Sequence, residues 1–247
     1  MFKNLFGRKP RTTGRGLEHG PGEDHYRAYV GPPADYDRIA AMTFNLLTCL
    51  GLREDDVALD VGCGSLRIGR LLIPYLAPGN YIGVEPNEWL VNDGIINELG
   101  GEDLVRLKRP HFVFRDSIAG EPNLPKARFA FAQSIFSHCG GDLVARWLNE
   151  LHGALTEDGA LVATHWPGNK DNDREGWIYP DCVGFTVETM QALGEAAGFR
   201  VRRLDWHHPT QFWMLYAKPG FEHAALETGE VSWNGTHAET WTRRKRK

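Results

Sequence analysis

The stretch VALDVGCGSLRIGR, residues 57–70, places a glycine-rich turn between an apolar run and a helix-like segment. Gly62 and Gly64 carry no Cβ, so the backbone of the turn can approach a bound ligand closely. Asp60 precedes the turn, and Glu85 follows Gly64 by 21 residues, at the end of the next apolar run. Residues of these types at this spacing are suited to hold a nucleoside, because backbone atoms contact the ligand while the acid accepts hydrogen bonds from ribose hydroxyls.

Two kinds of nucleoside cofactor use such a turn, and the neighbouring residues favour S-adenosylmethionine over a dinucleotide. The dinucleotide pattern GxGxxG has a third glycine that lets helix and strand pack closely, whereas this turn has Arg67 at that place. The carboxylate of Asp60 would repel a pyrophosphate but suits the sulfonium and ammonium charges of S-adenosylmethionine. Arg67 either bonds a cofactor carboxylate or faces water, and we expect it to face water.

Three successive apolar runs carry an acid at or near their carboxyl end. Asp60 is the fourth residue of VALDV, Glu85 ends YIGVE and Asp116 ends HFVFRD. The carboxyl ends of parallel strands meet at one edge of a sheet, where open α/β folds bind their ligands. We therefore expect Glu85 to accept both ribose hydroxyls and Asp116 to accept from the exocyclic amine of an adenine.

Strand-like and helix-like segments alternate along the chain, which predicts an α/β fold with a mostly parallel sheet and helices on both faces. Strands are expected at 57–61, 81–85, 111–116, 127–135, 159–166, 199–206 and 210–218. Helices are expected at 35–51, 66–76, 87–100, 142–155 and 186–198. Asp35, Asp142 and Thr186 are the expected helix caps. The last two strands form a hairpin, so the final strand should run antiparallel.

The motifs LDVGCGS, IGVEPN, FRDS and FAQSIFSH resemble those of class I S-adenosylmethionine-dependent methyltransferases, over about residues 35–218. Such proteins have a Rossmann-like, doubly wound sheet of seven strands, of which the last is antiparallel. The resemblance implies S-adenosylmethionine as cofactor, with contacts from Asp60, Gly62, Cys63, Gly64, Glu85, Asp116, Ser117, Gln133 and Ser134. Asp60 and the turn would hold its methionine end, Asp116 and Ser117 its adenine. Leu66 departs from the pattern, since many relatives have a third glycine there.

Methyl transfer is an in-line displacement that depends mainly on orientation, and a hydroxyl acceptor also needs a base. His138 follows the fourth expected strand and His165 the fifth, both at the ligand-binding edge. We expect one of them to be the base, with His138 the first choice. His207 and His208 lie by the closing hairpin, where alternate residues point to opposite faces, so a paired metal site is not expected there, and no cluster of ligands predicts a metal.

Aromatic residues flank the expected mouth of the site. Tyr26 and Tyr29 precede the first helix, while Trp177 and Tyr179 lie in the long polar segment 167–184 that follows the fifth strand. Long connections at this edge are often lids. We expect these four residues to contact the substrate and exclude water.

The acceptor is expected to be a small or sugar-like molecule methylated on oxygen or nitrogen. Adenine methyltransferases of DNA carry Asp/Asn-Pro-Pro-aromatic after the fourth strand, where this chain has QSIF. Without the ten basic residues of its two ends, 18 of the 28 Lys and Arg remain against 32 Asp and Glu, which opposes binding to nucleic acid. The alternatives are a protein or RNA methyltransferase steered by the basic tails, a regulatory module that binds the cofactor without catalysis, and a nicotinamide-dependent oxidoreductase.

The 247 residues suit one sizeable domain. We expect a flexible basic lead-in at 1–24, a methyltransferase domain at 25–220 and a tail at 221–247 that ends in RRKRK. The four cysteines are scattered, no apolar run approaches the ~20 residues of a membrane helix, and no secretory signal is visible. A cytoplasmic protein without a transmembrane segment is therefore expected.

Overall fold

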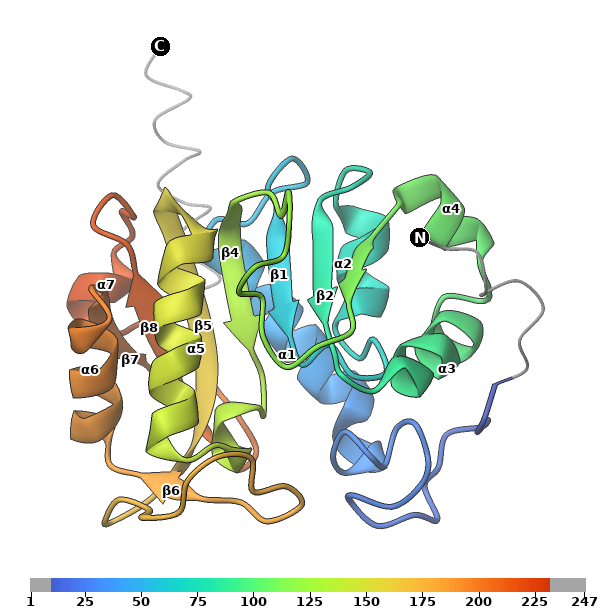
Figure 1. The fold of residues 1–247 in the computed structure, drawn as a ribbon, viewed down its shortest axis with the longest axis horizontal. Coiled ribbons are helices and arrows are strands. Elements are labelled where there is room, and N and C mark those ends of the chain that lie inside the picture. Colours follow the sequence, from blue (N-terminus) through green and yellow to red (C-terminus); the bar gives the residue numbers. More distant parts are fainter. Residues whose placement is uncertain (1–9, 232–247) are drawn as a thin grey trace.

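A twisted central sheet with helices on both faces organises residues 10–231, the part of the chain that the computed structural model describes (Figure 1). The basic run at 243–247 lies outside these residues. The strands are β1 (Ala58–Val61), β2 (Tyr81–Val84), β3 (His111–Val113), β4 (Ala127–Ala132), β5 (Leu155–Pro167), β6 (Gly184–Phe185), β7 (Arg200–Leu204) and β8 (Phe212–Ala217). The main sheet has the order β3-β2-β1-β4-β5-β8-β7, and β6 pairs separately with the end of β5.

The strand directions confirm the predicted architecture. Strands β1 to β5 pair in parallel, whereas β8 runs antiparallel to both β5 and β7. Every expected strand is present in the seven-stranded main sheet. The two-residue strand β6 was not expected, because Gly184–Phe185 is too short to carry a periodic pattern.

All five expected helices are present, and the structure adds two short ones that were not expected, at Asp103–Lys108 and Ala225–Thr228. The helices are α1 (Tyr36–Cys49), α2 (Gly69–Tyr75), α3 (Glu88–Glu98), α4 (Asp103–Lys108), α5 (Gly141–Ala154), α6 (Val187–Ala196) and α7 (Ala225–Thr228), with 3-10 turns η1 (Pro33–Asp35) and η2 (Phe136–His138). The Thr186 cap is confirmed, since its side chain accepts from the Thr189 amide. Asp35 occupies the N-cap position of α1, but its side chain makes no capping hydrogen bond, and the expected cap at Asp142 is wrong because Gly140 holds that position in α5. Asp35 pairs with Arg38, and Asp142 accepts instead from the amide of Gly176.

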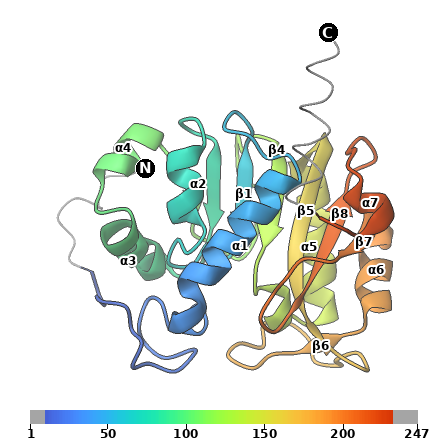
Figure 2. The same ribbon diagram turned by 180° about the vertical axis from the view of Figure 1, so that it is seen from behind.

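Two hydrophobic clusters cover the two faces of the sheet. One contains residues of α1, α2, α3 and α4, and the other contains residues of α5 and α6. Figure 1 shows α5 in front of the sheet, and Figure 2 shows α1 and α2 on the opposite side. Side chains alternate between these faces along each strand. In β1, Leu59 and Val61 pack toward α5, so Asp60 between them faces α2.

Two long segments run along the carboxyl edge of the parallel strands, the lower edge in Figure 1. One is the N-terminal strap, which we define as residues 10–32, and the other is the segment 167–184 around β6. They meet where the Tyr179 hydroxyl donates to the carbonyl of Tyr29 at 2.9 Å. The rings of the same two residues lie 5.2 Å apart. The two segments thus cover this edge of the sheet together.

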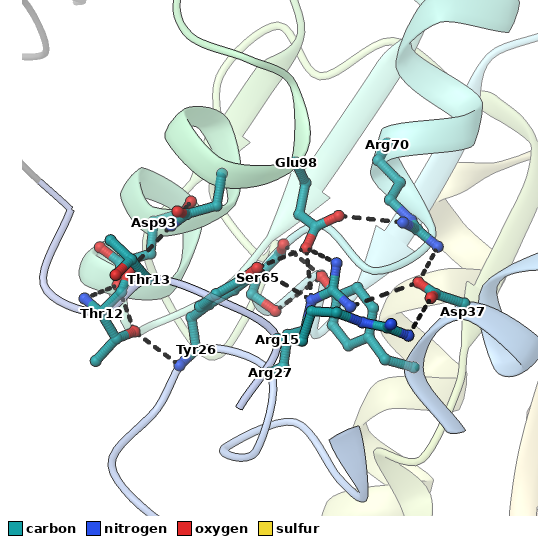
Figure 3. A network of polar contacts seen from close by, with 12 residues as sticks. Thr12, Thr13, Arg15, Tyr26, Arg27, Asp37, Ser65, Arg70, Asp93 and Glu98 are labelled. Atoms are coloured by element: carbon teal, nitrogen blue, oxygen red, sulfur yellow. Dashed lines mark hydrogen bonds and ion pairs between the residues drawn. The ribbon is translucent and has the colours of Figure 1, made fainter. Parts of the chain in front are cut away.

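A buried carboxylate on α3 holds the start of the strap (Figure 3). Asp93 is 1 % exposed and accepts from the amide of Arg11 at 2.7 Å, and from the amide and hydroxyl of Thr12 at 2.7 and 2.8 Å. Asn97, one turn later, donates to the Thr12 carbonyl at 3.0 Å. The lead-in expected to be flexible is therefore bound to the fold over its described part.

A second carboxylate of α3 binds the middle of the strap. Glu98 accepts from Arg27 at 2.6 Å, from the Tyr26 hydroxyl at 2.8 Å and from Arg70 of α2 at 3.1 Å. Arg70 also contacts Asp37 of α1 at 2.7 Å. Figure 3 shows these groups converging from the strap and three helices. Because Glu98 and Arg27 are largely buried, their pairing is screened less than a surface ion pair.

Replacing Asp93 by alanine should release the strap without unfolding the domain. The variant loses three hydrogen bonds to a charged acceptor, each with a net value of about 1.5–3 kcal/mol. Amide hydrogen exchange in residues 10–32 should accelerate by at least about 10-fold, the effect of losing one such bond, while exchange in β1 and β4 stays unchanged. The control is Asp103→Ala, which removes an exposed pairing with Arg106. Unchanged exchange in the strap would contradict this account of its anchoring.

Candidate functional site

A cavity of about 770 Å³ opens at the carboxyl edge of the parallel strands. Its walls come from the strap, the glycine turn after β1, the ends of β2, β3 and β4, and the 167–184 segment. Its size falls within the range of about 300–1,000 Å³ that is usual for small-molecule sites. The predicted residues that line it are Tyr29, Gly62, Gly64, Glu85, Asp116, Gln133, Ser134, His138, Trp177 and Tyr179.

The glycine turn has the left-handed backbone that its sequence suggests. Gly62 and Gly64 have φ of +69° and +51°, and Leu66 keeps this conformation at φ +62° in place of a third glycine. A Cβ on Gly62 would lie 2.0 Å from Ile135, and one on Gly64 would lie 2.6 Å from Val30. The glycines therefore seat two apolar side chains of the cavity wall against the turn. The fully buried side chain of Leu66 offsets its unfavourable backbone by packing in the core.

Glu85 joins the end of β2 to this turn. Its Oε2 accepts from the Gly64 amide at 3.1 Å, and its Oε1 accepts from the amide and side chain of Asn87 at 2.8 Å each. Burial raises the pKa of Glu85, and the hydrogen bonds from Asn87 and Gly64 oppose that shift. A carboxylate has about four acceptor positions, so Glu85 can still accept from a ligand in the cavity. The role of Asn87 in holding Glu85 was not predicted, although Asn87 follows Glu85 by only two residues, a spacing at which its amide groups can reach the carboxylate.

Asp60 is not among the residues that line the cavity. It faces α2, as the alternation in β1 requires, and its Oδ2 accepts from the Tyr81 hydroxyl at 2.7 Å. The expected contact with the methionine end therefore needs correction. Burial raises the pKa of Asp60 to about 7, against the lowering effects of Tyr81 and Arg67.

Cys63 and Ser117 also lie outside the cavity lining. The Cys63 thiol is buried beside Gly83, where burial raises its pKa. The Ser117 hydroxyl donates to Glu150 of α5, with oxygens at 2.9 and 3.0 Å. These contacts give both residues structural roles in place of the expected cofactor contacts. Asp116 does reach the rim, where its side chain is 78 % exposed and 3.5 Å from Arg146.

Arg67 does not face water, contrary to our expectation. It is 6 % exposed and lies in the cavity wall. Its guanidinium donates to the carbonyl of Val30 at 2.8 Å and to Oε1 of Gln133. The side chain of Arg67 thus links the strap to the end of β4. Its burial could not be predicted, because the strap that covers it carries no periodic signal.

His138 presents one ring nitrogen for chemistry. Its Nδ1 lies 2.7 Å from the carbonyl of Asp181. A carbonyl only accepts, so Nδ1 carries the proton and Nε2 of the neutral ring has a free lone pair. Burial lowers the pKa of His138, which keeps the ring neutral at pH 7. Orientation and protonation therefore both suit a general base.

His165 is removed from the candidate bases by its position. It lies in the core, 1 % exposed, with Nε2 2.8 Å from the Tyr216 hydroxyl. Burial lowers its pKa to about 3. In β5, Leu161 and Ala163 pack toward α5, and the alternation turns His165 to the same face. It is therefore a buried neutral side chain away from the cavity.

Three of the four predicted aromatic residues form one cluster over the cavity. Trp177 and Tyr179 stack at 6.0 Å, and both contact the ring of His138, at 5.7 and 5.2 Å. Tyr29 joins them from the strap through Tyr179. Tyr26 is the exception, because its hydroxyl donates to Glu98 away from the cavity. The strap and the 167–184 segment thus place an aromatic cover beside the candidate base.

Two further properties of the described part of the chain concern ligands and membranes. Within residues 10–231, no three His, Cys, Asp or Glu side chains gather in a way that would hold a metal ion. No helix in the same range has the length and apolar composition that crossing a membrane requires.

Replacing Asp60 by asparagine should change how stability depends on pH. With a folded pKa near 7 and an ordinary value of 3.8, Asp60 binds more proton in the folded state between these limits, so wild-type stability falls as pH rises through that window. The asparagine keeps an acceptor for Tyr81 but cannot ionise. The melting temperature of the variant relative to wild type should therefore rise from pH 4.5 to pH 8. Parallel profiles from thermal unfolding at both pH values would contradict this burial of the carboxyl.

Comparisons with known proteins identify the fold. No protein-family model matches the sequence, and no curated protein does. Among solved structures, magnesium protoporphyrin IX methyltransferase (ChlM) from Synechocystis PCC 6803 with bound SAM is 12 % identical, with 83 % of this chain and 88 % of that chain covered and a TM-score of 0.57. Streptomyces venezuelae DesVI is 16 % identical, with coverages of 74 % and 92 % and a TM-score of 0.54. The pyocyanin biosynthetic protein PhzM is 17 % identical, with coverages of 82 % and 60 % and a TM-score of 0.56. The chain therefore has the fold of the class I S-adenosylmethionine-dependent methyltransferases, as its motifs predicted.

Proposed function

We propose that this protein is an S-adenosylmethionine-dependent methyltransferase that acts on a small-molecule acceptor. The observation that carries the proposal is the Glu85 carboxylate, buried at the end of β2 and 3.1 Å from the amide of Gly64 in a cavity at the carboxyl edge. This is the place where open α/β folds bind nucleoside ligands, with an acid on the ribose. The proposed catalytic domain extends beyond the expected residues 25–220 at both ends, because the strap is part of its site and Phe221 and Ala225, expected in the tail, are buried in its core.

The residues present fit S-adenosylmethionine. Glu85 would accept the ribose hydroxyls, and Asp116 at the rim would accept from the adenine amine. Gly62 and Gly64 would let the backbone approach the methionine end, with Gln133 and Ser134 alongside it. In support, two solved structures of the same fold are described with bound SAM and with bound SAH.

A small acceptor suits the dimensions and cover of the cavity. The strap and the 167–184 segment meet above it through Tyr29 and Tyr179, which limits entry by a bulky polymer. Its wall beside His138 is mainly apolar and aromatic, including Ile135, Trp166 and Trp177. Such walls with a few polar groups are typical of small-molecule sites.

His138 would accept the proton of a hydroxyl or amine acceptor. When bound, S-adenosylmethionine supplies an electrophilic methyl group. Nε2 of His138 holds the lone pair for the acceptor proton, while Asp181 fixes the ring through Nδ1. Trp177 and Tyr179 pack on the ring, and with an acceptor bound they would keep water from the reacting atoms, which would strengthen the interactions of charges within the site.

Replacing Glu85 by glutamine should weaken S-adenosylmethionine binding by about 10- to 100-fold, because two ribose hydrogen bonds lose a charged acceptor. Calorimetric titration of wild type and variant with S-adenosylmethionine, S-adenosylhomocysteine and NAD measures this loss. The control is Glu195→Gln, which alters an exposed acid of α6 that accepts from Gln191, away from the cavity. Wild-type binding of NAD alone would overturn the proposed function.

Replacing His138 by asparagine should lower kcat by about 10²- to 10⁴-fold, the usual contribution of a general base. The asparagine amide can still donate to Asp181, so S-adenosylhomocysteine should bind as in wild type. Because burial lowers the pKa of His138, the neutral base persists in acid, and wild-type activity should decline only below about pH 6.5. Turnover is followed by tritium transfer from methyl-labelled cofactor to an acceptor found by screening hydroxylated compounds, with His111→Asn as control. Unchanged kcat would remove His138 as the base, and cofactor binding without transfer to any acceptor would indicate a regulatory module.

A further inference from the structure

The guanidinium of Arg67 is a buried cation that makes no ion pair or hydrogen bond with a carboxylate within residues 10–231; Asp60 and Asp35 act on it only through space. The other two buried cations of this range are paired, Arg27 with Glu98 at 2.6 Å and Lys218 with Glu157 at 3.4 Å. Buried charges are normally paired, because desolvation of an isolated charge is unfavourable. Burial lowers the pKa of Arg67 only to about 10, so the group stays charged at pH 7.

The hydrogen bonds of Arg67 do not use all the N–H donors of its guanidinium. Nη1 donates to the carbonyl of Val30 and Nη2 to Oε1 of Gln133, both of which are neutral acceptors. Nε is buried and has no hydrogen-bond partner. A guanidinium carries five donors in a planar fork that matches a carboxylate. The hydrogen bonds of Arg67 therefore leave its charge without an ion-pair partner and some of its N–H donors without an acceptor.

His208 is a second donor without an acceptor, and it contacts Gln133, the glutamine that accepts from Arg67. Nδ1 of His208 accepts from the amides of Thr210 and Gln211 at 3.2 and 2.9 Å, so the proton of the neutral ring is on Nε2. Burial, together with the charge of Arg67, lowers the pKa of His208 to about 4. Its Nε2 lies 3.3 Å from the amide nitrogen of Gln133, which is also a donor because Oε1 faces Arg67. The Nε2 proton of His208 thus lacks an acceptor on Gln133.

We propose that Arg67 and His208 form a carboxylate-binding subsite of the cavity, whose missing acceptor and missing negative charge a ligand supplies. The proposal rests on the proposed function. A carboxylate would pair with the fork of Arg67 through charge-assisted hydrogen bonds and accept from His208. It can belong to the amino-acid end of the methyl donor or to the acceptor molecule. Oε1 of Gln211, buried without a partner beside Ser134, would suit an ammonium group near that carboxylate.

The subsite also connects ligand binding to the strap. The guanidinium that would hold the carboxylate already holds the carbonyl of Val30. A ligand that fixes Arg67 should therefore also fix the strap, since two groups ordered by one contact stabilise each other. Amide exchange in residues 10–32 should slow with a nucleoside that carries a carboxylate, more than with one that lacks it.

The test compares two nucleosides that differ in the amino-acid group. S-adenosylhomocysteine and 5′-methylthioadenosine are titrated into wild type, Arg67→Gln and His208→Asn, with the exposed Arg53→Gln as control. The His208 variant keeps an acceptor for the Thr210 and Gln211 amides but loses the Nε2 donor. We expect Arg67→Gln to weaken S-adenosylhomocysteine by about 10- to 100-fold and His208→Asn to weaken it less, with 5′-methylthioadenosine unchanged by either. If the Arg67 variant does not fold, His208→Asn keeps the test, because it too should weaken S-adenosylhomocysteine and leave 5′-methylthioadenosine unchanged.

Benzoate titrated into protein loaded with S-adenosylhomocysteine distinguishes the two sources of the carboxylate. Loss of benzoate binding in Arg67→Gln, with both nucleosides unaffected, would assign the subsite to the acceptor. Equal weakening of both nucleosides, or no response of S-adenosylhomocysteine and benzoate, would overturn the subsite. Failure of wild type to bind either nucleoside would instead overturn the proposed function.

Discussion

The hydrogen bond from the Gly64 amide to the buried Glu85 carboxylate joins the two strand ends between which the cavity opens. Glu85 can lie there because the turn after β1 has a left-handed backbone, which brings the amide of Gly64 toward the end of β2. The same turn has no Cβ at Gly62 or Gly64, so Ile135 of the turn after β4 and Val30 of the strap can pack against it. The position of the cavity walls therefore depends on this one backbone conformation.

The strap completes the site because two buried carboxylates of α3 hold it. Asp93 binds its start and Glu98 its middle, which places Tyr29 and Val30 over the glycine turn. From there Tyr29 contacts the 167–184 segment, and Val30 accepts from Arg67. An acidic helix thus positions residues of the cavity that lie far from it in sequence. Enclosure by ordered segments favours reaction of a small molecule away from water.

The order of the longer strands and helices could be predicted from the sequence, because each of them has an apolar pattern of sufficient length. The surroundings of side chains that contact residues far away in the sequence could not be predicted. Asp60 and His165 lie near the ends of their strands at the expected edge, yet each faces a packed helix layer, since a one-residue step reverses the face. The strap was expected to be flexible because its glycine, proline and charges have no periodicity, and its partner Asp93 lies 82 residues from Arg11. The burial of Arg67 follows from the strap and was missed with it.

A crystal structure of the protein grown with S-adenosylhomocysteine would test most directly whether the cavity is a methyl-donor site. We expect the ribose hydroxyls to lie within hydrogen-bond distance of Glu85, and the thioether sulfur to lie between the glycine turn and His138. The adenine should lie toward Asp116 and the strap should remain closed over the ligand. A nucleoside bound away from Glu85, or a cavity that stays free of ligand at saturating concentration, would contradict this expectation.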